Sequence, residues 1–418
     1  MDIDASTGHP RSHVVDRVVI PINLFGNQEY LLNIIILGLI PSKKEALVNH
    51  PQTPWLALIF VATSALLTGC VLPGYPGKVL PTPTLVPPTA PPPVRPSPSP
   101  TLPLRSPVVV DTDMAADDWM AILFLLQRPE LEVVAITVTG TGEAHCEAGM
   151  QHALELVALA AYGDIPVACG LETPLQGDHA FPDIWREEVD NLLGLNLPES
   201  QQVPSELTAV ELLTSTIQSS PDKITLLTLG PLTNVGEALH SYPYLVDKLE
   251  RIYIMGGAVN SPGNVGQSGV GIENNTAEWN LYIDPLAANL VLGSGVPITL
   301  VPLDATNHVP LTSKLFSRLE SDHTTPEATF VYEVLGAHSD VFDKGSYYLW
   351  DPLAAAILTD DSVGIFQDKN LCVVETEGVE SGWSKTGSNC PLVRVAVSAD
   401  GYRFEQLFVD TLNNADDF

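Results

Sequence analysis

The sequence predicts an α/β fold: a mostly parallel central sheet with helices on both faces and a small antiparallel addition at the carboxyl terminus. From Pro107 onward, short runs rich in β-branched residues alternate with segments of helical periodicity. Strands separated by helices of about 10–15 residues are typical of βαβ units, whose strands lie parallel. In the last part of the chain, apolar runs follow one another closely, which indicates antiparallel strands.

The expected elements follow in chain order. The strands of the parallel sheet are Val108–Val110, Leu131–Val138, Ile165–Ala168, Ile224–Leu229, Ile252–Met255 and Ile298–Pro302. The helices between them are Asp117–Gln127, Cys146–Ala161, Ala209–Ser219, Leu232–Leu239 and Pro285–Leu292. The antiparallel addition comprises Leu371–Glu375, Leu392–Val397 and Tyr402–Val409. Because ligands bind at the carboxyl ends of strands in such sheets, we expect the site at that edge.

Composition divides the chain into three parts. Residues 71–107 contain 14 Pro and no Asp or Glu, a makeup that cannot bury a core and indicates a flexible tether. Residues 108–418 are long and apolar enough for one large core, so we expect a single catalytic-size domain there. Residues 1–70 precede the tether and are interpreted as an export and anchor region.

Residues 55–67 indicate export, because they form an apolar run with the length of a signal-peptide h-region that is too short for an easy bilayer span. Residues 67–70 (Leu-Thr-Gly-Cys) follow and resemble the lipobox of bacterial lipoproteins. We therefore expect an exported, extracytoplasmic protein anchored to the cell membrane by lipidation of Cys70. The alternative is a short hydrophobic helix that ends in Cys by chance. Residues 1–42 fit a signal peptide badly, so a later start and a second anchor segment both stay open.

Residues 108–418 carry 45 acidic and 12 basic side chains, a net charge of −33. Such a unit repels phosphate backbones and anionic headgroups. Nucleic acid and a polybasic contact with membranes are therefore excluded as leading ideas. Neutral small molecules and divalent cations remain compatible partners.

The most informative segment is Val108-Val-Val-Asp-Thr-Asp-Met-Ala-Ala-Asp-Asp118, which places four carboxylates where a buried strand gives way to a helix. Asp117 and Asp118 fall in the first helical turn, where the helix dipole favours anions. Like charges this close raise one another's pKa unless a cation neutralises them. Oxygen ligands alone favour Ca²⁺ or Mg²⁺ over zinc. The alternative is that these residues only cap a helix and line a solvated loop.

This segment resembles the amino-terminal fingerprint of the inosine-uridine preferring nucleoside hydrolases. Further matching motifs follow in order: Thr228–Asn234, Met255–Gly257, Gly263–Asn264, Ala277–Asn280 leading into Asp284–Pro285, and Trp350–Pro352. The resemblance spans residues 107–418. It implies a Rossmann-related sheet and hydrolysis of the N-glycosidic bond of nucleosides to free base and ribose.

The resemblance also implies the roles of single residues. The expected Ca²⁺ ligands are Asp113, Asp118, the backbone carbonyl of Leu229, and Asp351. Asp113 would also take the proton from the attacking water. The expected ribose contacts are Asp117, Asn264, Glu278 and Asn280, with Met255 beside the sugar. An oxocarbenium-like transition state needs such anionic surroundings, an activated water and oriented sugar hydroxyls. The alternatives are plain core packing for Met255 and helix capping for Glu278 and Asn280.

Two positions depart from the family pattern. Many members have Gly-Asn after the second strand, where this chain has Gly142-Glu143, so Glu143 or a neighbour replaces an amide near the sugar and the role of Glu143 stays open. Trp350 stands where many members have the His of His-Asp-Pro, the proposed acid for the leaving base. Tryptophan cannot donate that proton, and the purine-specific branch carries an aromatic residue there. Trp350 therefore implies purine nucleosides held by stacking, with packing beside Asp351 as the alternative.

Three further features come from the loops and the tail. Trp185 is a candidate second stacking wall, and His179 resembles a pocket-rim position, although a loop histidine is often only solvated. The four cysteines of the domain allow one or two disulfides, with Cys372–Cys390 favoured, or buried free thiols. Members of the family often form dimers or tetramers, so a homo-oligomer is an open expectation.

The leading hypothesis is thus a lipid-anchored, calcium-dependent nucleoside hydrolase that prefers purine nucleosides and serves salvage outside the cytoplasmic membrane. A second hypothesis is a nucleoside-binding surface lipoprotein that has lost turnover with its His. A third is an aspartate-nucleophile phosphatase, because Asp111-Thr-Asp113 follows an apolar strand. The acidity of the domain disfavours phosphorylated substrates.

Overall fold

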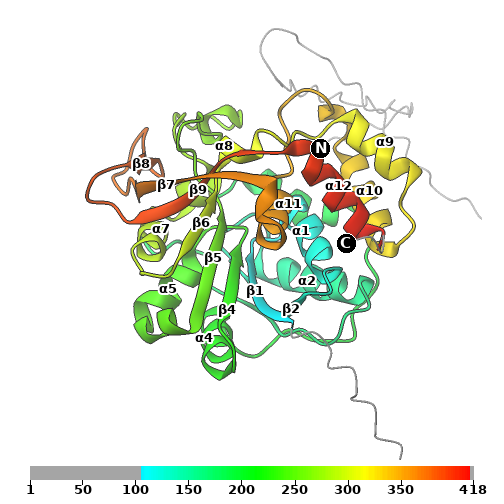
Figure 1. Cartoon of the computed structure of the whole chain (residues 1–418), viewed down its shortest axis with the longest axis horizontal. Coiled ribbons are helices and arrows are strands. Elements are labelled where there is room, and N and C mark those ends of the chain that lie inside the picture. Colours follow the sequence, from blue (N-terminus) through cyan, green and yellow to red (C-terminus); the bar gives the residue numbers. More distant parts are fainter. Residues whose placement is uncertain (1–104, 415–418) are drawn as a thin grey trace, which may run out of the picture. The chain divides into compact units, whose positions relative to one another are not determined.

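The computed structural model describes residues 105–414, whose arrangement is shown in Figure 1. They contain one nine-stranded sheet with the order β3-β2-β1-β4-β5-β6-β9-β7-β8. Its strands are β1 (Ser106–Thr112), β2 (Leu131–Val138), β3 (Val167–Cys169), β4 (Ile224–Thr228), β5 (Leu249–Met255), β6 (Ile298–Val301), β7 (Gly364–Val373), β8 (Ser384–Thr386) and β9 (Leu392–Ala399).

The sheet is parallel from β3 through β6 and on to β9. β7 runs antiparallel to β9, and β8 runs antiparallel to β7. The predicted mostly parallel sheet with an antiparallel addition is therefore confirmed. β9 is the strand that joins the two parts, since it pairs in parallel with β6 on one side and antiparallel with β7 on the other.

Twelve α-helices lie within residues 105–414. They are α1 (Ala116–Leu126), α2 (Cys146–Leu159), α3 (Asp183–Asp190), α4 (Ala209–Ser219), α5 (Thr233–Ser241), α6 (Trp279–Ile283), α7 (Pro285–Leu292), α8 (Leu303–Thr306), α9 (Ser313–Ser321), α10 (Pro326–Ala337), α11 (Trp350–Thr359) and α12 (Gly401–Leu412). The short 3₁₀ helices are η1 (Leu192–Gly194), η2 (Pro243–Lys248), η3 (Val265–Gln267), η4 (Ser339–Val341) and η5 (Asp361–Val363).

Successive side chains of β1 pack on opposite faces of the sheet, as the alternation of a strand requires. Val108 and Val110 join the core under α1, α2, α10, α11 and α12, whereas Val109 joins the core under α4, α5 and α7. Figure 1 shows these two groups of helices on either side of the sheet. Helices on both faces leave the strand ends at the carboxyl edge as the place where polar residues gather.

The prediction of a strand at Tyr402–Val409 is wrong, because this segment lies in α12. Phe404 and Phe408, one helical turn apart, are both fully buried, and Asp400 caps the helix by accepting from the N–H of Arg403. The apolar residues therefore follow the helical period of about 3.6 rather than the strand period of 2.

Two disulfides form among the described residues. Cys372–Cys390, the favoured pair, joins β7 to the turn before β9. Cys146–Cys169 joins the start of α2 to the end of β3, so the alternative of buried free thiols does not apply to these four cysteines.

The expected h-region at 55–67, the lipobox at 67–70 with Cys70, and nearly all of the tether at 71–107 lie outside the described residues. β1 begins at Ser106, two residues before the expected start of the domain. Within residues 105–414, none of the helices combines the length and the apolar character that a membrane span requires.

Candidate active site

The first part of the site is the turn between β1 and α1. Met114 has a φ of 60°, and this sharp turn brings the first helical residues back over the end of the strand. The carboxylate of Asp118 accepts from the N–H of Asp113 at 3.2 Å, from the N–H of Ala115 at 3.1 Å and from the hydroxyl of Thr112. Asp118 therefore holds the loop at the amino end of α1, where the helix dipole stabilises its charge.

The second part comes from α11, whose first turn carries Asp351. The carboxylates of Asp117, Asp118 and Asp351 each offer an oxygen, and these oxygens lie within 4.8 Å of one another. Burial, followed by the charge of Asp118, raises the pKa of Asp117 to about 8. Burial and then the charges of Asp117 and Asp118 raise the pKa of Asp351 well above its usual range. Like charges in a buried cluster call for either protons or a cation.

The third part is the loop after β2, which packs directly on Asp113. The N–H of Glu143 donates to Oδ2 of Asp113 at 3.2 Å, and the N–H of Ala144 donates to the backbone carbonyl of Asp113 at 2.9 Å. A Cβ at Gly142 would lie 1.9 Å from the Cβ of Asp113, and one at Gly230 would lie 2.6 Å from it. These two positions therefore need glycine because the chain passes so close to Asp113.

Asp113 and Glu143 also belong to the acidic cluster electrostatically. Burial raises the pKa of Asp113, and the neighbouring charges of Asp118 and Glu143 raise it further. Burial, then the charges of Asp117 and Asp118, raise the pKa of Glu143 to about 8. The resemblance gave Glu143 no role, and the structure places its backbone N–H on the carboxylate that is expected to accept the proton of water.

These residues fit a hard divalent cation. The donors are all oxygen atoms, they are buried, and Oδ1 of Asp351 has no hydrogen-bond partner among the described residues. The carbonyl of Leu229, the expected backbone ligand, accepts from the side-chain amide of Asn280 at 2.8 Å. Oxygen donors of this kind suit Ca²⁺. The resemblance assigns Asp117 to ribose binding, but one of its oxygens lies within 4.8 Å of an oxygen of Asp118 and of Asp351, so Asp117 is also a candidate ligand.

The expected ribose contacts gather around α6. Glu278 accepts from the N–H groups of Asn280 at 2.8 Å and Leu281 at 3.3 Å, so it caps α6, and it also accepts from Gly257 at 2.7 Å. Burial raises the pKa of Glu278 to about 7. The side-chain amide of Asn280 also reaches the backbone carbonyl of Met255 at 3.2 Å. The contacts of Glu278 and Asn280 therefore reach the ends of β4 and β5.

Asn264 contributes to the same region through the backbone. Its Oδ1 accepts from the N–H of Trp279 at 3.2 Å, and its own N–H donates to the carbonyl of Ala277. The segment that contains Asn264 is thus attached to the start of α6, next to Glu278.

An aromatic group borders the carboxylates. The ring of Trp350 lies 4.9 Å from that of Tyr347 and 5.7 Å from that of Tyr348, and its indole N–H has no partner among the described residues. Burial, then the charges of Asp117 and Glu143, raise the pKa of Tyr347 well above its usual range. Tyr347 and Tyr348 were not among the predicted site residues, although they stand just before the Trp350 motif.

His179 and Trp185 both contact residues of α6. The ring nitrogens of His179 contact the carbonyl of Tyr282 at 2.6 Å and the carboxylate of Glu377 at 3.0 Å. The ring of Trp185 lies edge-on to Trp279 at 5.3 Å, in an aromatic cluster with Phe181. Their contacts are with α6 and its surroundings, and their roles as pocket rim and stacking wall stay predictions.

Asp111 belongs to the interior and not to the cluster. It is fully buried, and Oδ1 accepts from the hydroxyl of Thr137 at 2.6 Å and from the side-chain amide of Asn234 at 2.8 Å. Burial raises the pKa of Asp111 to about 7. A nucleophile must reach its substrate, so this environment argues against a phosphatase that uses Asp111.

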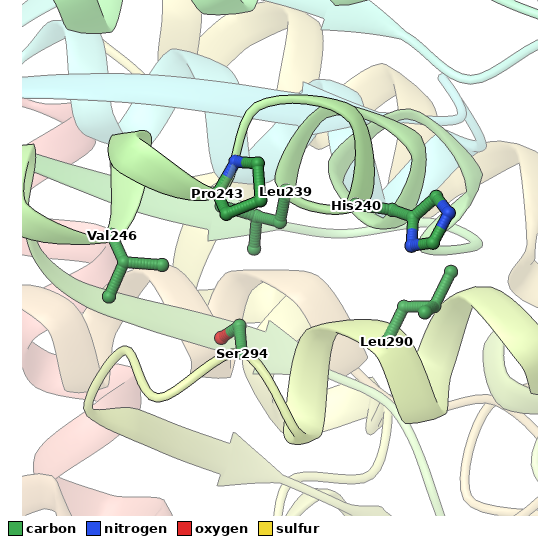
Figure 2. Close-up of a pocket in the computed structure, with 6 residues that line it drawn as sticks. All are labelled: Leu239, His240, Pro243, Val246, Leu290 and Ser294. Carbon is green, nitrogen blue, oxygen red and sulfur yellow. The ribbon is translucent and has the colours of Figure 1, made fainter.

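A separate pocket of about 230 Å³ lies between α5, η2 and α7. Figure 2 shows its lining by Leu239, His240, Pro243, Val246, Leu290 and Ser294. Leu239 and His240 stand at the carboxyl end of α5, whose amino end follows the carboxyl end of β4, and the other lining residues come from η2, α7 and the turn after α7. The lining contains no carboxylate, so the chemistry described above belongs to the carboxylate cluster and not to this pocket.

Residues 108–406 match the family model described as inosine-uridine preferring nucleoside hydrolase. The chain belongs to this family. The resemblance first identified from short motifs is thereby confirmed, and the family, the relatives and the solved structures support a ribonucleoside hydrolase enzyme.

Relatives and solved structures that resemble this chain differ in whether their names give purine or pyrimidine nucleosides as substrates. The pyrimidine-specific ribonucleoside hydrolase RihA of Klebsiella pneumoniae is 37% identical over 278 residues, which cover 65% of this chain and 85% of the relative. The plant nucleoside hydrolase PpNRh1 has a TM-score of 0.66 at 29% identity, covering 74% of this chain and 99% of that one. The purine-preferring ribonucleoside hydrolase of Gardnerella vaginalis has a TM-score of 0.62 at 25% identity, covering 74% and 98%.

Proposed function

We propose that this nucleoside hydrolase uses Ca²⁺ at the Asp117, Asp118 and Asp351 cluster, and that it prefers purine nucleosides. The observation that carries the proposal is the grouping of these three buried carboxylates beside the aromatic group of Trp350 and Tyr347. The chain would act as an exported lipoprotein anchored through Cys70.

The mechanism assigns one task to each part of the site. Asp117, Asp118 and Asp351 would hold the Ca²⁺, which would supply an acidified water as the nucleophile. Asp113 accepts a proton from that water, and the N–H of Glu143 fixes the orientation of its carboxylate. The surrounding carboxylates stabilise positive charge that develops on the sugar as the N-glycosidic bond breaks.

The sugar and the base are held by different groups. Glu278 and Asn280 offer buried acceptors and donors for the ribose hydroxyls, with Asn264 next to them. Trp350 provides a flat apolar surface for stacking of the base, and its free indole N–H is a donor for a base atom. Stacking favours the larger surface of a purine.

The base preference has a second candidate, because RihA relatives are named pyrimidine-specific. A nucleoside panel with the full chain and Trp350→His separates the two. We expect the wild type to release ribose faster from inosine, adenosine and guanosine than from uridine and cytidine, and we expect Trp350→His to lose that preference. Equal or faster release from pyrimidine nucleosides by the wild type would reject purine preference.

The anchor is tested independently of catalysis. The full chain is expressed in a bacterial host fed with labelled palmitate. The chain itself should become labelled and should be recovered in the membrane fraction, and Cys70→Ala should not. Label in the variant would show that the lipobox reading is wrong.

A further inference from the structure

The loop between β2 and α2 (residues 139–145) determines how Asp113 is oriented. Three of its consecutive residues touch Asp113: Gly142 by close approach, Glu143 through its N–H to Oδ2, and Ala144 through its N–H to the backbone carbonyl. Since a carboxylate rotates freely unless it is held, the position of this loop sets the geometry of the proton acceptor.

The beginning of the loop is fixed by β2, whose Val138 pairs with Thr112 of β1. Its other end has a covalent constraint, the disulfide from Cys146, the first residue of α2, to Cys169 at the end of β3. Cys146 also packs beneath the loop, because a Cβ at Gly140 would lie 2.8 Å from its Sγ. The disulfide therefore ties the far end of the loop to the sheet.

Two residues of α3, Arg186 and Asp190, make non-covalent contacts with the same loop. The buried guanidinium of Arg186 donates to the carbonyl of Gly140 at 3.0 Å and to that of Ala144 at 3.4 Å. Asp190 accepts from the N–H of His145 at 2.9 Å and contacts its ring nitrogen at 2.6 Å. These contacts remain when the disulfide is opened, so the loop should loosen rather than unfold.

We propose that the Cys146–Cys169 disulfide is a positioning element of the active site, which holds Glu143 and Ala144 against Asp113. The inference rests on the proposed role of Asp113 as proton acceptor. Opening the disulfide lowers turnover because Asp113 loses its fixed orientation. Binding of ribose changes little, because Glu278 and Asn280 are held by α6 and the ends of β4 and β5.

The second disulfide provides a matched control. Cys372–Cys390 closes a loop of similar length, with a sequence separation of 18 against 23. Its hydrogen-bonded neighbours are Asn370 and Gly387, in β7 and the turn before β9. Loss of either disulfide removes one cross-link from the unfolded chain, so a general effect on stability appears in both variants.

The experiment compares full-chain Cys146→Ala/Cys169→Ala with Cys372→Ala/Cys390→Ala. We expect kcat to fall roughly tenfold in the first variant, less than the 10²-fold that a misplaced group can cost, because α3 still holds the loop. KM should stay within about twofold, a change of less than 0.5 kcal/mol in binding. The control should keep the wild-type kcat. Equal kcat values in the two variants would overturn the proposal.

A second measurement does not depend on hydrolysis. Amide hydrogen exchange at Glu143 and Ala144 should be faster in Cys146→Ala/Cys169→Ala and unchanged in the control, and unchanged exchange in both would overturn the proposal. Nucleoside hydrolysis by the wild type tests the proposed function separately, so the two failures are distinguishable.

Reduction supplies a third arm that avoids a folding defect. In the Cys372→Ala/Cys390→Ala variant, dithiothreitol passes two electrons and two protons to the Cys146–Cys169 bond, which gives two thiols and the oxidised reagent. We expect kcat to fall on reduction and to recover on reoxidation with glutathione disulfide. A kcat that is unaffected after both thiols have been titrated would contradict the proposal.

Discussion

Asp111 and Asp113 lie two residues apart at the end of β1, yet their surroundings are opposite. Asp111 is enclosed by neutral donors, the hydroxyl of Thr137 and the amide of Asn234. Asp113 faces the carboxylates of Asp118 and Glu143. A buried acid among neutral donors can exist as a protonated structural group, whereas a buried cluster of acids calls for a cation. The comparison separates a residue that holds the sheet together from residues that perform chemistry.

The largest effect is expected for Asp113→Asn. The amide cannot accept the proton of the attacking water, so kcat should fall by about 10³, within the usual range for loss of a general base. The replacement has the same shape and removes one of the crowded negative charges, so the folded state should persist. Steady-state ribose release and circular dichroism check the two parts of this prediction. A kcat within tenfold of the wild type would show that another group accepts the proton.

The sequence predicted the strand and the cluster around these residues because their signals are local. Val108–Val110 is a plain apolar strand, and four aspartates follow it within eight positions. Asp351 was found only through its motif, since its place beside Asp117 depends on how α11 packs across the sheet edge. Arg186 was missed because nothing in the sequence of α3 shows that its guanidinium reaches back to Gly140. Tertiary contacts of this kind have no local signature.

The next effect concerns the cation itself. Calcium at 100 times its dissociation constant should raise the free energy of unfolding by about 3 kcal/mol, because it binds the folded cluster and not the unfolded chain. Urea unfolding of the full chain with Ca²⁺ and with EDTA measures this difference. Asp351→Asn should remove most of the calcium-dependent part, while Asp111→Asn should retain it. Equal calcium responses in the two variants would place the cation elsewhere.

A smaller effect is expected for Asp111→Asn, which should lower the free energy of unfolding by about 1 kcal/mol. The loss is small because both partners of Oδ1 are donors, and an amide oxygen can accept from them as well. The pH dependence is more telling. The pKa of Asp111 is raised from 3.8 to about 7, so the folded state binds more protons than the unfolded state between these values. Its contribution to stability is full below pH 4 and declines as pH rises toward 7.

Asp111→Asn should therefore flatten the fall in stability between pH 4 and 7, compared with the wild type. Urea unfolding across this range, with EDTA present, measures the difference between the two curves. Parallel curves would mean that Asp111 ionises as freely in the folded chain as in the unfolded one.

The smallest effect is expected from the hydroxyl of Tyr347. Its ring contacts Trp350, and its pKa is raised by burial and by the charges of Asp117 and Glu143, so the protonated hydroxyl faces the acidic site. Tyr347→Phe keeps the ring and should lower kcat about fivefold, the equivalent of one hydrogen bond of about 1 kcal/mol. Tyr348→Phe is the matched control, because that hydroxyl donates to the carbonyl of Gly345 within its own loop. If both variants keep the wild-type kcat, the aromatic group contributes only its flat apolar surface. The carboxylates would then be the groups that make the polar contacts required for hydrolysis.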